Sequence, residues 1–385
     1  MPKGRNPIPL TTVLVSNVIL AVSQTNIASV FLPISETFHQ TVYGLGILSS
    51  VFFVGYFVFE VPSNVYGVRL GPRGLATFGA ALAAAALFAC ALAPSFDLLV
   101  VFRLLVGAGY GIFFPSAIVL AMRNAGEGSA GFGIALMTAA FSIGGALGVA
   151  SWSLLSSDFG WRVSLLFEGA ITTAAAASLR LLTERETGSA SQISSSFRRV
   201  LSNRKVLILG LCFFGSAVSA TTTGSFIVYY LEEVFGLGPG IASLAAGVDY
   251  ITLVFSGFLA GRMFDRGFNG KLLVFGSALA LTIGTVVIGV HSVYAAYLGS
   301  VSVGLSVGFL STIVFALSGR VSPVREDDNM ALAVVDSFSL GGLLVGPLIF
   351  PPLVVAFGYP PAWAALSVFS VLFALPVLLS REVSR

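Results

Sequence analysis

The chain consists of long apolar runs separated by short polar, glycine-containing or proline-containing breaks. Twelve such runs occur along its 385 residues. In the first half they cover residues 10–32, 42–66, 75–93, 98–122, 131–155 and 163–182, and in the second half residues 206–231, 241–264, 272–290, 294–317, 331–357 and 362–379. Each run can cross about 30 Å of hydrocarbon as a helix, and open strand edges are not tolerated there. The pattern therefore predicts an all-α integral membrane protein with twelve transmembrane helices.

The composition agrees with this prediction and excludes several function classes. Hydrophobic residues make up 56% of the chain and charged residues 10%, and the mean hydropathy is +0.96, unlike an ordinary soluble enzyme. The net charge of +3 is too small to indicate a nucleic-acid partner. Cys90 and Cys212 lie inside apolar runs, so neither a disulfide framework nor a CxxC metal site is predicted, and we expect no cofactor.

The distribution of basic residues predicts the topology. If the amino terminus is cytoplasmic, 18 of the 20 lysines and arginines fall on that side, the exceptions being Arg103 within a run and Arg162 at an outer edge. The positive-inside rule then places both termini in the cytoplasm, and we expect the plasma membrane as the location. A cleavable signal peptide is an alternative for the first run, but that run is longer than a typical signal-peptide core and lacks a clean cleavage site.

A polar, serine-rich and basic segment, residues 183–204, divides the chain into two parts. We expect it to be a cytoplasmic linker between an amino-terminal six-helix bundle, residues 1–182, and a carboxy-terminal one, residues 205–385. The two parts are related in sequence. An offset of 197 residues places Arg69 on Arg266, Gly107 on Gly304, Gly111 on Gly308 and residues 141–145 on residues 338–342, and one inserted residue later 159–161 falls on 357–359. The repeat predicts two pseudo-symmetric bundles.

Four stretches carry a family resemblance. They are Pro62–Arg73 between the second and third runs, its counterpart Gly261–Gly267, Arg103–Gly111 with its Arg-x-x-x-Gly-x-Gly-x-Gly spacing, and Gly342-x-x-x-Gly346-Pro347. Together they resemble the major facilitator superfamily over nearly the whole chain. The resemblance departs at Asn64 and Val68 of the first loop, and at Val149, where the span-five copy lacks the proline.

This resemblance implies a fold, an activity and a set of gating residues. The implied protein is a secondary transporter that alternates access by moving two six-helix bundles. The positions that match the family's loop and helix signatures are the expected gating residues: Arg69, Gly71, Arg73, Asp265, Arg266, Gly107, Gly111, Gly342, Gly346 and Pro347.

Five ionisable residues fall inside the predicted spans: Glu60, Arg103, Glu168, Asp249 and Asp336. Each costs about 3 kcal/mol at the centre of a helix, so each needs a partner, a cavity or a function. Glu60, Glu168 and Asp336 lie close enough to helix ends to reach water, whereas Arg103 and Asp249 lie deeper. We expect all five to be candidates for proton coupling.

Alternatives to proton coupling stay open for these residues. The resemblance associates Arg103 with coupling, but a structural hydrogen bond to backbone carbonyl groups is the alternative. Asp249 can instead be a paired structural residue or contact a cationic substrate, and Asp336 can be a latch against the Asp265–Arg266 loop. Glu60 and Glu168 can be interface anchors.

Polar groups near the middle of the spans predict a substrate site. In the family that the sequence resembles, the first, fourth, seventh and tenth spans line the cavity. The residues expected there or beside Asp249 are Gln24, Asn26, Arg103, Tyr229, Tyr230, Asp249 and Tyr250.

We expect a proton-coupled carrier of a small organic anion, acting as a monomer among membrane lipids. Proton-driven efflux of cationic or amphipathic compounds is the alternative, because the predicted spans contain four acidic residues and one arginine. A membrane enzyme is disfavoured, since the sequence lacks the HExxH and Walker-type motifs. A receptor or channel is disfavoured by the lack of a sensor domain and of a charged ring.

Overall fold

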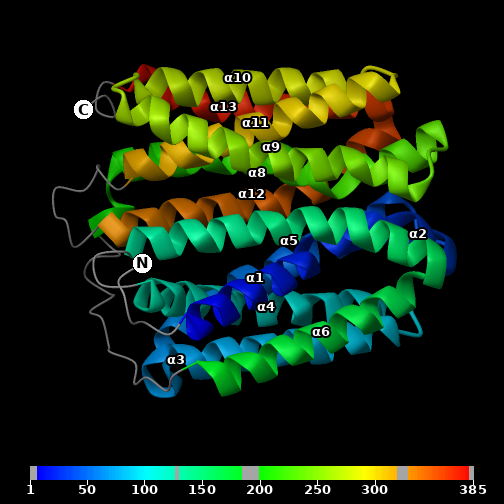
Figure 1. The fold of residues 1–385 in the computed structure, drawn as a ribbon. Coiled ribbons are helices and arrows are strands. Elements are labelled where there is room, and N and C mark those ends of the chain that lie inside the picture. The colour runs from blue at the N-terminus through cyan, green and yellow to red at the C-terminus, as the bar shows by residue number, and fades with distance from the viewer. Residues whose placement is uncertain (1–6, 126–129, 184–198, 319–327, 381–385) are drawn as a thin grey trace. The chain divides into compact units, whose positions relative to one another are not determined.

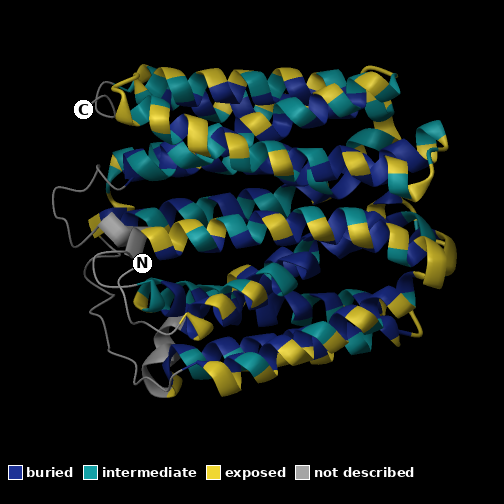
Figure 2. Cartoon of the chain, viewed as in Figure 1, coloured by how far each residue is buried: buried dark blue, intermediate teal, exposed yellow. Residues whose placement is uncertain are grey.

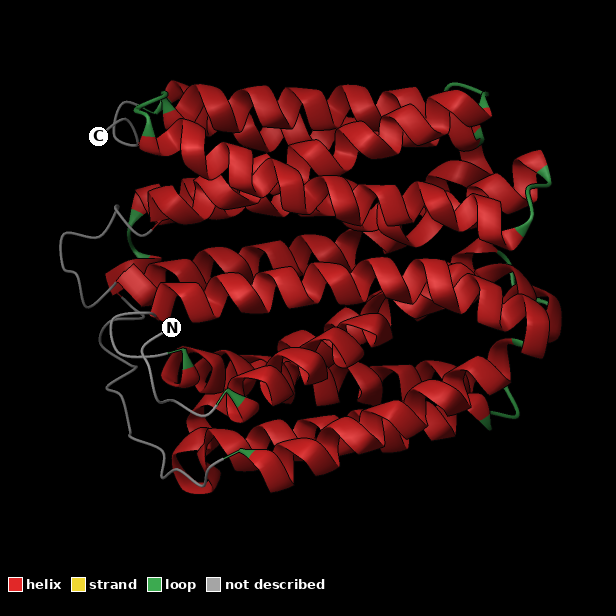
Figure 3. Ribbon diagram, viewed as in Figure 1, coloured by secondary structure: helices red, strands yellow, loops and turns green. Residues whose placement is uncertain are grey.

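The computed structural model describes residues 7–125, 130–183, 199–318 and 328–380 (Figure 1). Within these ranges, twelve helical segments are long and apolar enough to cross a membrane, and the secondary structure is helical (Figure 3). The prediction of an all-α membrane protein with twelve spans is therefore confirmed. Lipid imposes this outcome, because a helix satisfies its backbone N–H and C=O groups within one segment.

The chain divides into two compact units, Met1–Ala190 and Ser191–Arg385. Most of the expected linker 183–204, and the ends of the chain whose cytoplasmic location was predicted, lie outside the described residues. Each unit contributes six of the twelve spans.

The first unit begins with a span that the sequence pattern treated as one helix. The structure divides it into α1 (Ile8–Thr25), the 3₁₀ helix η1 (Asn26–Val30) and α2 (Phe31–Phe38). Both the second and third spans lie in α3 (Val42–Ala91), which leaves helical geometry at Gly71. The unit is completed by α4 (Phe96–Asn124), α5 (Ala130–Phe159) and α6 (Trp161–Leu182).

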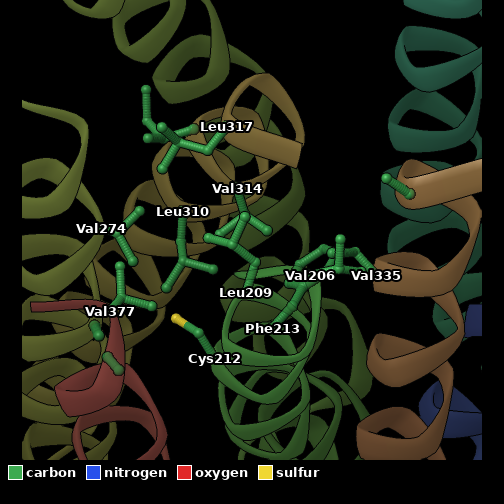
Figure 4. Close-up of a cluster of buried hydrophobic side chains, with 14 of the residues drawn as sticks. Val206, Leu209, Cys212, Phe213, Val274, Leu310, Val314, Leu317, Val335 and Val377 are labelled. Atoms are coloured by element: carbon green, nitrogen blue, oxygen red, sulfur yellow. The ribbon is translucent and has the colours of Figure 1, made fainter. Parts of the chain in front are cut away.

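The second unit contains α8 (Arg204–Phe235), α9 (Pro239–Asp265), α10 (Gly270–Ile288), α11 (Val293–Ser318), α12 (Asp328–Phe357) and α13 (Tyr359–Leu379). One buried core cluster joins α8 to α10, α11, α12 and α13 through aliphatic side chains, with the free thiol of Cys212 among them (Figure 4). Its labelled members include Leu209, Val274, Leu310, Val335 and Val377.

Exposed and buried residues alternate around the helices (Figure 2). Large apolar side chains stand on the exposed faces: Phe255 and Phe258 of α9 are 70% and 69% exposed. Apolar side chains exposed to this extent along helices of spanning length fit a surface in contact with lipid tails.

Glycines of α4 let it approach both arms of α3. A Cβ atom at Gly107 would overlap the carbonyl oxygen of Phe52, and one at Gly111 would overlap that of Tyr56. On the opposite arm, a Cβ atom at Gly109 would lie 2.6 Å from the backbone nitrogen of Ala83. Small residues at such contacts let helix backbones pack closely in lipid.

The second unit repeats this contact with the same register. A Cβ atom at Gly304 of α11 would overlap the carbonyl oxygen of Asp249 on α9, and one at Gly308 would overlap that of Leu253. Both contacts follow from those of α4 by adding 197 to each residue number. The repeat seen in the sequence is thus a repeat of helix packing.

The register differs by one residue between α5 and α12. A Cβ atom at Gly144 would overlap the carbonyl oxygen of Val18, and the matching contact in the second unit is that of Gly342 with Phe214. Gly144 therefore corresponds to Gly342, a shift of 198, whereas the sequence offset of 197 placed it on Gly341. The same shift relates Gly160 (φ +84°) to Gly358 (φ +81°), which precede α6 and α13 in conformations that favour glycine.

We predict that Gly107→Ala lowers the free energy of unfolding by about 2 kcal/mol, because the added methyl group overlaps a backbone atom that cannot move alone. Gly276→Ala is the matched control, since a Cβ atom there meets nothing within 4 Å and alanine favours the helix. Thermal unfolding of both variants in detergent measures the difference. Equal midpoints for the two variants would contradict the close approach of α4 to α3.

Candidate functional site

The first span breaks where its sequence becomes polar. Helix α1 ends at Thr25, and Asn26 begins the 3₁₀ turn. The Thr25 hydroxyl group donates to the carbonyl oxygen of Gly145 (3.2 Å), and Ser29 Oγ donates to the carbonyl oxygen of Asn26 (2.6 Å). Side chains of this kind compete with the helical hydrogen-bond pattern, so this polar stretch favours a break, and the bond from Thr25 to Gly145 ties the break to α5.

Arg103 of α4 satisfies the carbonyl groups at this break. Its Nη1 donates to the carbonyl oxygen of Ser23 (2.6 Å) and its Nη2 to that of Gln24 (3.2 Å). The guanidinium carbon lies 4.6 Å from the centre of the Phe52 ring, and the side chain is 1% exposed. The structure therefore shows the alternative given above for Arg103, in which its side chain donates hydrogen bonds to backbone carbonyl groups.

Glu168 of α6 lies at the same break, and its side chain is fully buried. Its Oε2 accepts a hydrogen bond from Asn26 Nδ2, and its carboxyl group interacts electrostatically with Arg103 and Cys90. The expectation that Glu168 reaches water was wrong. Position along α6 placed Glu168 close to a helix end, but side chains of α1, η1, α3, α4 and α5 surround its carboxyl group.

The Glu168 carboxyl group lies among polar groups on buried side chains. Ser23 of α1, Asn26 of η1 and Trp152 of α5 each direct a hydrogen-bond donor to it. Asn26 Oδ1 has no partner among the described residues. The carboxyl group is therefore surrounded by polar contacts from three helices.

Asp249 of α9 is the buried carboxyl group of the second unit. It is 8% exposed, and its Oδ1 has no partner among the described residues. Tyr250 lies beside it, half-buried, with its hydroxyl group directed toward Gly224 of α8. At the offset of 197, Asp249 takes the place of Phe52 and Ser300 that of Arg103, so the cation of the first unit has a neutral counterpart here.

The remaining expected substrate residues are Gln24, Tyr229 and Tyr230. Gln24 is half-buried, and its backbone carbonyl group rather than a side-chain contact ties it to Arg103. Tyr229 is buried. Tyr230 is fully buried in an aromatic cluster, with its ring centre 4.9 Å from that of Tyr359 and 6.0 Å from that of Trp363. The ring of Tyr230 therefore packs against other aromatic rings within the second unit.

Glu60 and Asp336 are half-buried. The Ser339 hydroxyl group donates to Asp336 Oδ1 (3.2 Å), and the backbone carbonyl group of Glu60 accepts from Ser63 Oγ (2.7 Å). Within the part of the chain that the structure describes, the hydrogen bond of Asp336 thus goes to its own helix rather than to the Asp265–Arg266 loop.

The expected gating residues occupy turns and helix contacts. Gly71 has φ +70°, a conformation that favours glycine, and it separates the two arms of α3. Arg73 donates to the carbonyl oxygen of Arg180 near the end of α6, and Lys271 of α10 makes the equivalent bond to Ser380 after α13. A cation near the last carbonyl groups of a helix stabilises it.

The other expected gating residues fall into three groups. Asp265 and Arg266 are exposed at the end of α9. Gly342 and Gly346 bring α12 against the backbone of α8, and Pro347 follows them within α12. The side chain of Arg69 lies outside the described residues. No group of three or more histidine, cysteine, aspartate or glutamate side chains that could hold a metal ion occurs among the residues described.

The chain matches a family model described as Major Facilitator Superfamily over residues 13–238 and 209–385. It is 23% identical over 365 residues to the human voltage-gated purine nucleotide uniporter SLC17A9, covering 87% of this chain and 79% of that protein. It is 25% identical over 167 residues to the probable nitrate transporter NarT of Staphylococcus haemolyticus (strain JCSC1435), covering 43% and 41%. It is 30% identical over 166 residues to the multidrug resistance protein MdtG of Dickeya zeae (strain Ech586), covering 42% and 40%. The last two alignments span less than half of each relative.

Solved structures share the fold. A bacterial homolog of the human lysosomal transporter Spinster, in an inward-facing and unoccupied conformation, superposes with a TM-score of 0.83 at 17% identity and covers 98% of this chain and 97% of that one. A mutant of the nucleoside transporter NupG superposes with a TM-score of 0.80 at 13% identity, covering 96% and 99%.

We predict that Arg103→Met lowers the free energy of unfolding by about 3 kcal/mol, because two carbonyl groups and a buried carboxyl group lose their cationic partner. Arg204→Met is the control, since Arg204 is exposed at the start of α8. Thermal unfolding in detergent compares the two. A midpoint for Arg103→Met that equals that of the control would refute the role of Arg103 in holding the break.

Proposed function

The chain belongs to the Major Facilitator Superfamily, and on that premise we propose that it is a proton-coupled carrier of a small organic anion. The family consists of transporters, not enzymes, and the chain is accordingly a multi-pass membrane protein and a secondary transporter. Such proteins alternate access to a site between their two repeats. The finer parts of the proposal concern the coupling ion, the substrate and the location.

The observation that carries proton coupling is the pair of buried carboxyl groups, one in each unit. Glu168 is fully buried, and Asp249 is 8% exposed with its Oδ1 without a partner among the described residues. A charged side chain at such a place costs about 3 kcal/mol, so a proton is the simplest ligand that removes the cost. Asp336 and Glu60, half-buried in their spans, are the secondary candidates for carrying protons.

Support for an anionic substrate comes from chemistry and from two relatives. A proton bound to a carrier offsets the charge of an anion that crosses with it. Nitrate and purine nucleotides, the cargoes in the names of two relatives, are anions. We propose that Gln24, Asn26 and Tyr229 contribute polar contacts. Arg103 contributes a positive potential rather than a free clamp, because both terminal nitrogens already bind carbonyl groups.

Asp249 favours a second candidate function, proton-driven efflux of cationic or amphipathic compounds. No cation of the described second unit contacts its carboxyl group, and the neighbouring ring of Tyr250 suits an organic cation. The relative named as a multidrug resistance protein agrees with this chemistry.

We further propose that the protein lies in the plasma membrane as a monomer, with both termini in the cytoplasm. The support is the concentration of basic residues on one side of the predicted spans. Substrate, protons and membrane lipids are then its partners.

We predict that purified protein in liposomes accumulates an organic anion when the inside is alkaline. The probe is chosen by a thermal-shift comparison of benzoate, gluconate and ethidium, and the compound that stabilises the protein is used. A ligand at about 100 times its dissociation constant raises the free energy of unfolding by about 2.7 kcal/mol. Uptake of the selected radiolabelled probe, with the fluorescence of internal pyranine, then measures coupling. Flux that ignores the imposed pH gradient would identify a uniporter, and stabilisation by ethidium alone would favour the efflux candidate.

We predict that Asp249→Asn reduces gradient-driven accumulation of the selected probe by about tenfold or more while probe exchange continues, because the variant cannot release a proton. Asp158→Asn is the control, since Asp158 is exposed at the end of α5. Parallel uptake and counterflow assays separate the two effects. Accumulation that survives in Asp249→Asn would remove Asp249 from the coupling machinery, and a selective loss of ethidium stabilisation would assign it to cation binding.

A further inference from the structure

Two arginines lie together where the third span begins and the sixth span ends. Arg73 follows the turn at Gly71 on the second arm of α3, and it donates a hydrogen bond to the backbone carbonyl oxygen of Arg180 in the last turn of α6. This bond holds the guanidinium group of Arg73 against the backbone of a second arginine. We call Arg73 and Arg180 the basic corner of the first unit.

The charge of the basic corner is not compensated within the described part of the chain. No ion pair joins Arg73 or Arg180 to a carboxylate there, and the side chain of Arg180 is exposed. Arg73 has an Nε atom that is buried without a hydrogen-bond partner among the described residues. A guanidinium group has more N–H donors than one carbonyl oxygen can accept, so both arginines have donors left for an anion.

Exposed apolar side chains flank the basic corner. Leu70, at the start of the third span, is 61% exposed, and Leu181, next to Arg180, is 78% exposed. The sixth span ends at Leu182, so the corner lies at the edge of the hydrocarbon layer, where the headgroups of phospholipids begin. Leucines exposed at this level suit acyl chains, and arginines suit phosphate groups.

The second unit contains a similar corner. The shift of 198 residues places Arg73 on Lys271, which donates to a backbone carbonyl oxygen just after α13. The same shift places Leu181 on Leu379, and these two leucines are 78% and 77% exposed. The cation that binds a helix end and the exposed leucine beside it are therefore both repeated.

The two corners differ in their second cation. The shift of 198 residues places Arg180 of α6 on Leu378 of α13, which is half-buried. The second corner therefore has one cation, Lys271, among the described residues. Arginine binds phosphate through a planar fork of donors, whereas lysine acts as a point charge. The pair of guanidinium groups thus distinguishes the corner of the first unit.

We propose that the basic corner binds the headgroup of an anionic phospholipid. The phosphate lies between the guanidinium groups of Arg73 and Arg180, and the acyl chains run along Leu70 and Leu181. A lipid with net negative charge is preferred, because the cation of a zwitterionic headgroup offsets its own phosphate. The predicted orientation puts the corner in the cytoplasmic leaflet, whose anionic lipids attract basic side chains. The inference goes beyond the proposed transport activity and requires neither its substrate nor its coupling ion.

Native mass spectrometry of the full-length protein tests this proposal. The protein is released from mixed micelles that contain equal amounts of phosphatidylglycerol and phosphatidylcholine with the same acyl chains. The measured quantity is the ratio of phosphatidylglycerol to phosphatidylcholine retained on the protein. We expect the unaltered protein to retain phosphatidylglycerol preferentially, with a contribution of about fivefold from each arginine of the corner.

The variants separate the basic corner from other surface charges. Arg180→Met lowers the ratio about fivefold, because a charge is lost from a side chain that makes no hydrogen bond within the described residues. Arg180→Lys keeps the ratio within about twofold of the unaltered value, since the cation remains. Arg266→Met is the matched control, because Arg266 is an exposed arginine beside Asp265 at the end of α9, and it leaves the ratio unchanged. Leu378→Arg raises the ratio, because the second corner gains its second cation.

An unchanged ratio in Arg180→Met would overturn the proposal, as would an equal loss in Arg180→Met and Arg266→Met, because any surface cation would then serve. Displacement of the retained phosphatidylglycerol by glycerol 3-phosphate would also overturn it, since the site would then recognise a phosphate without a lipid. Thermal unfolding in lipid-free detergent checks the fold, and Arg180→Met is expected to unfold at the temperature of the unaltered protein. The measurement does not involve transport, so the lipid site and the proposed transport activity can fail separately.

Discussion

The backbone carbonyl groups at the end of α1 need hydrogen-bond partners, and the arrangement of the first unit depends on this need. They lie within a spanning segment, where no bulk water can pair with them, so another part of the protein must do so. Arg103 meets this need with two hydrogen bonds, and the face of Phe52 covers its guanidinium group. A buried cation then makes a buried carboxyl group tolerable nearby, and Glu168 occupies that place. The break, the cation and the acid therefore form one interdependent group.

The two units share a scaffold but differ in charge. Glycines in α4 and α11 bring equivalent helices into contact at equivalent residues, so the backbone arrangement is repeated. On that shared scaffold, Phe52 and Arg103 of the first unit correspond to Asp249 and Ser300 of the second. The first unit thus carries an internally compensated charge cluster, whereas no cation among the described residues of the second unit contacts Asp249.

Sequence reasoning predicted different parts of this protein unequally well. Twelve spans and the repeat follow from apolar runs and glycine spacing, because lipid leaves the helix as the form for a single apolar segment. Arg103 and Asp249 were identified as buried because both lie deep within their runs. Glu168 was misjudged, since depth along one helix does not reveal what its neighbours cover. The polar stretch from Gln24 to Asn26 was the one signal that could have indicated the break in the first span.

By itself, the sequence determined the all-helical spanning architecture, the repeat and the set of ionisable residues that membrane burial makes costly. Those properties depend on local composition and on the energetics of lipid. Only the tertiary structure decided that Arg103 binds backbone carbonyl groups, that Glu168 pairs with Asn26 and that Asp249 has an oxygen atom without a partner in the described unit. These pairings join residues 79 or more positions apart in the first unit, and helix packing, which the order of residues does not reveal, brings them together.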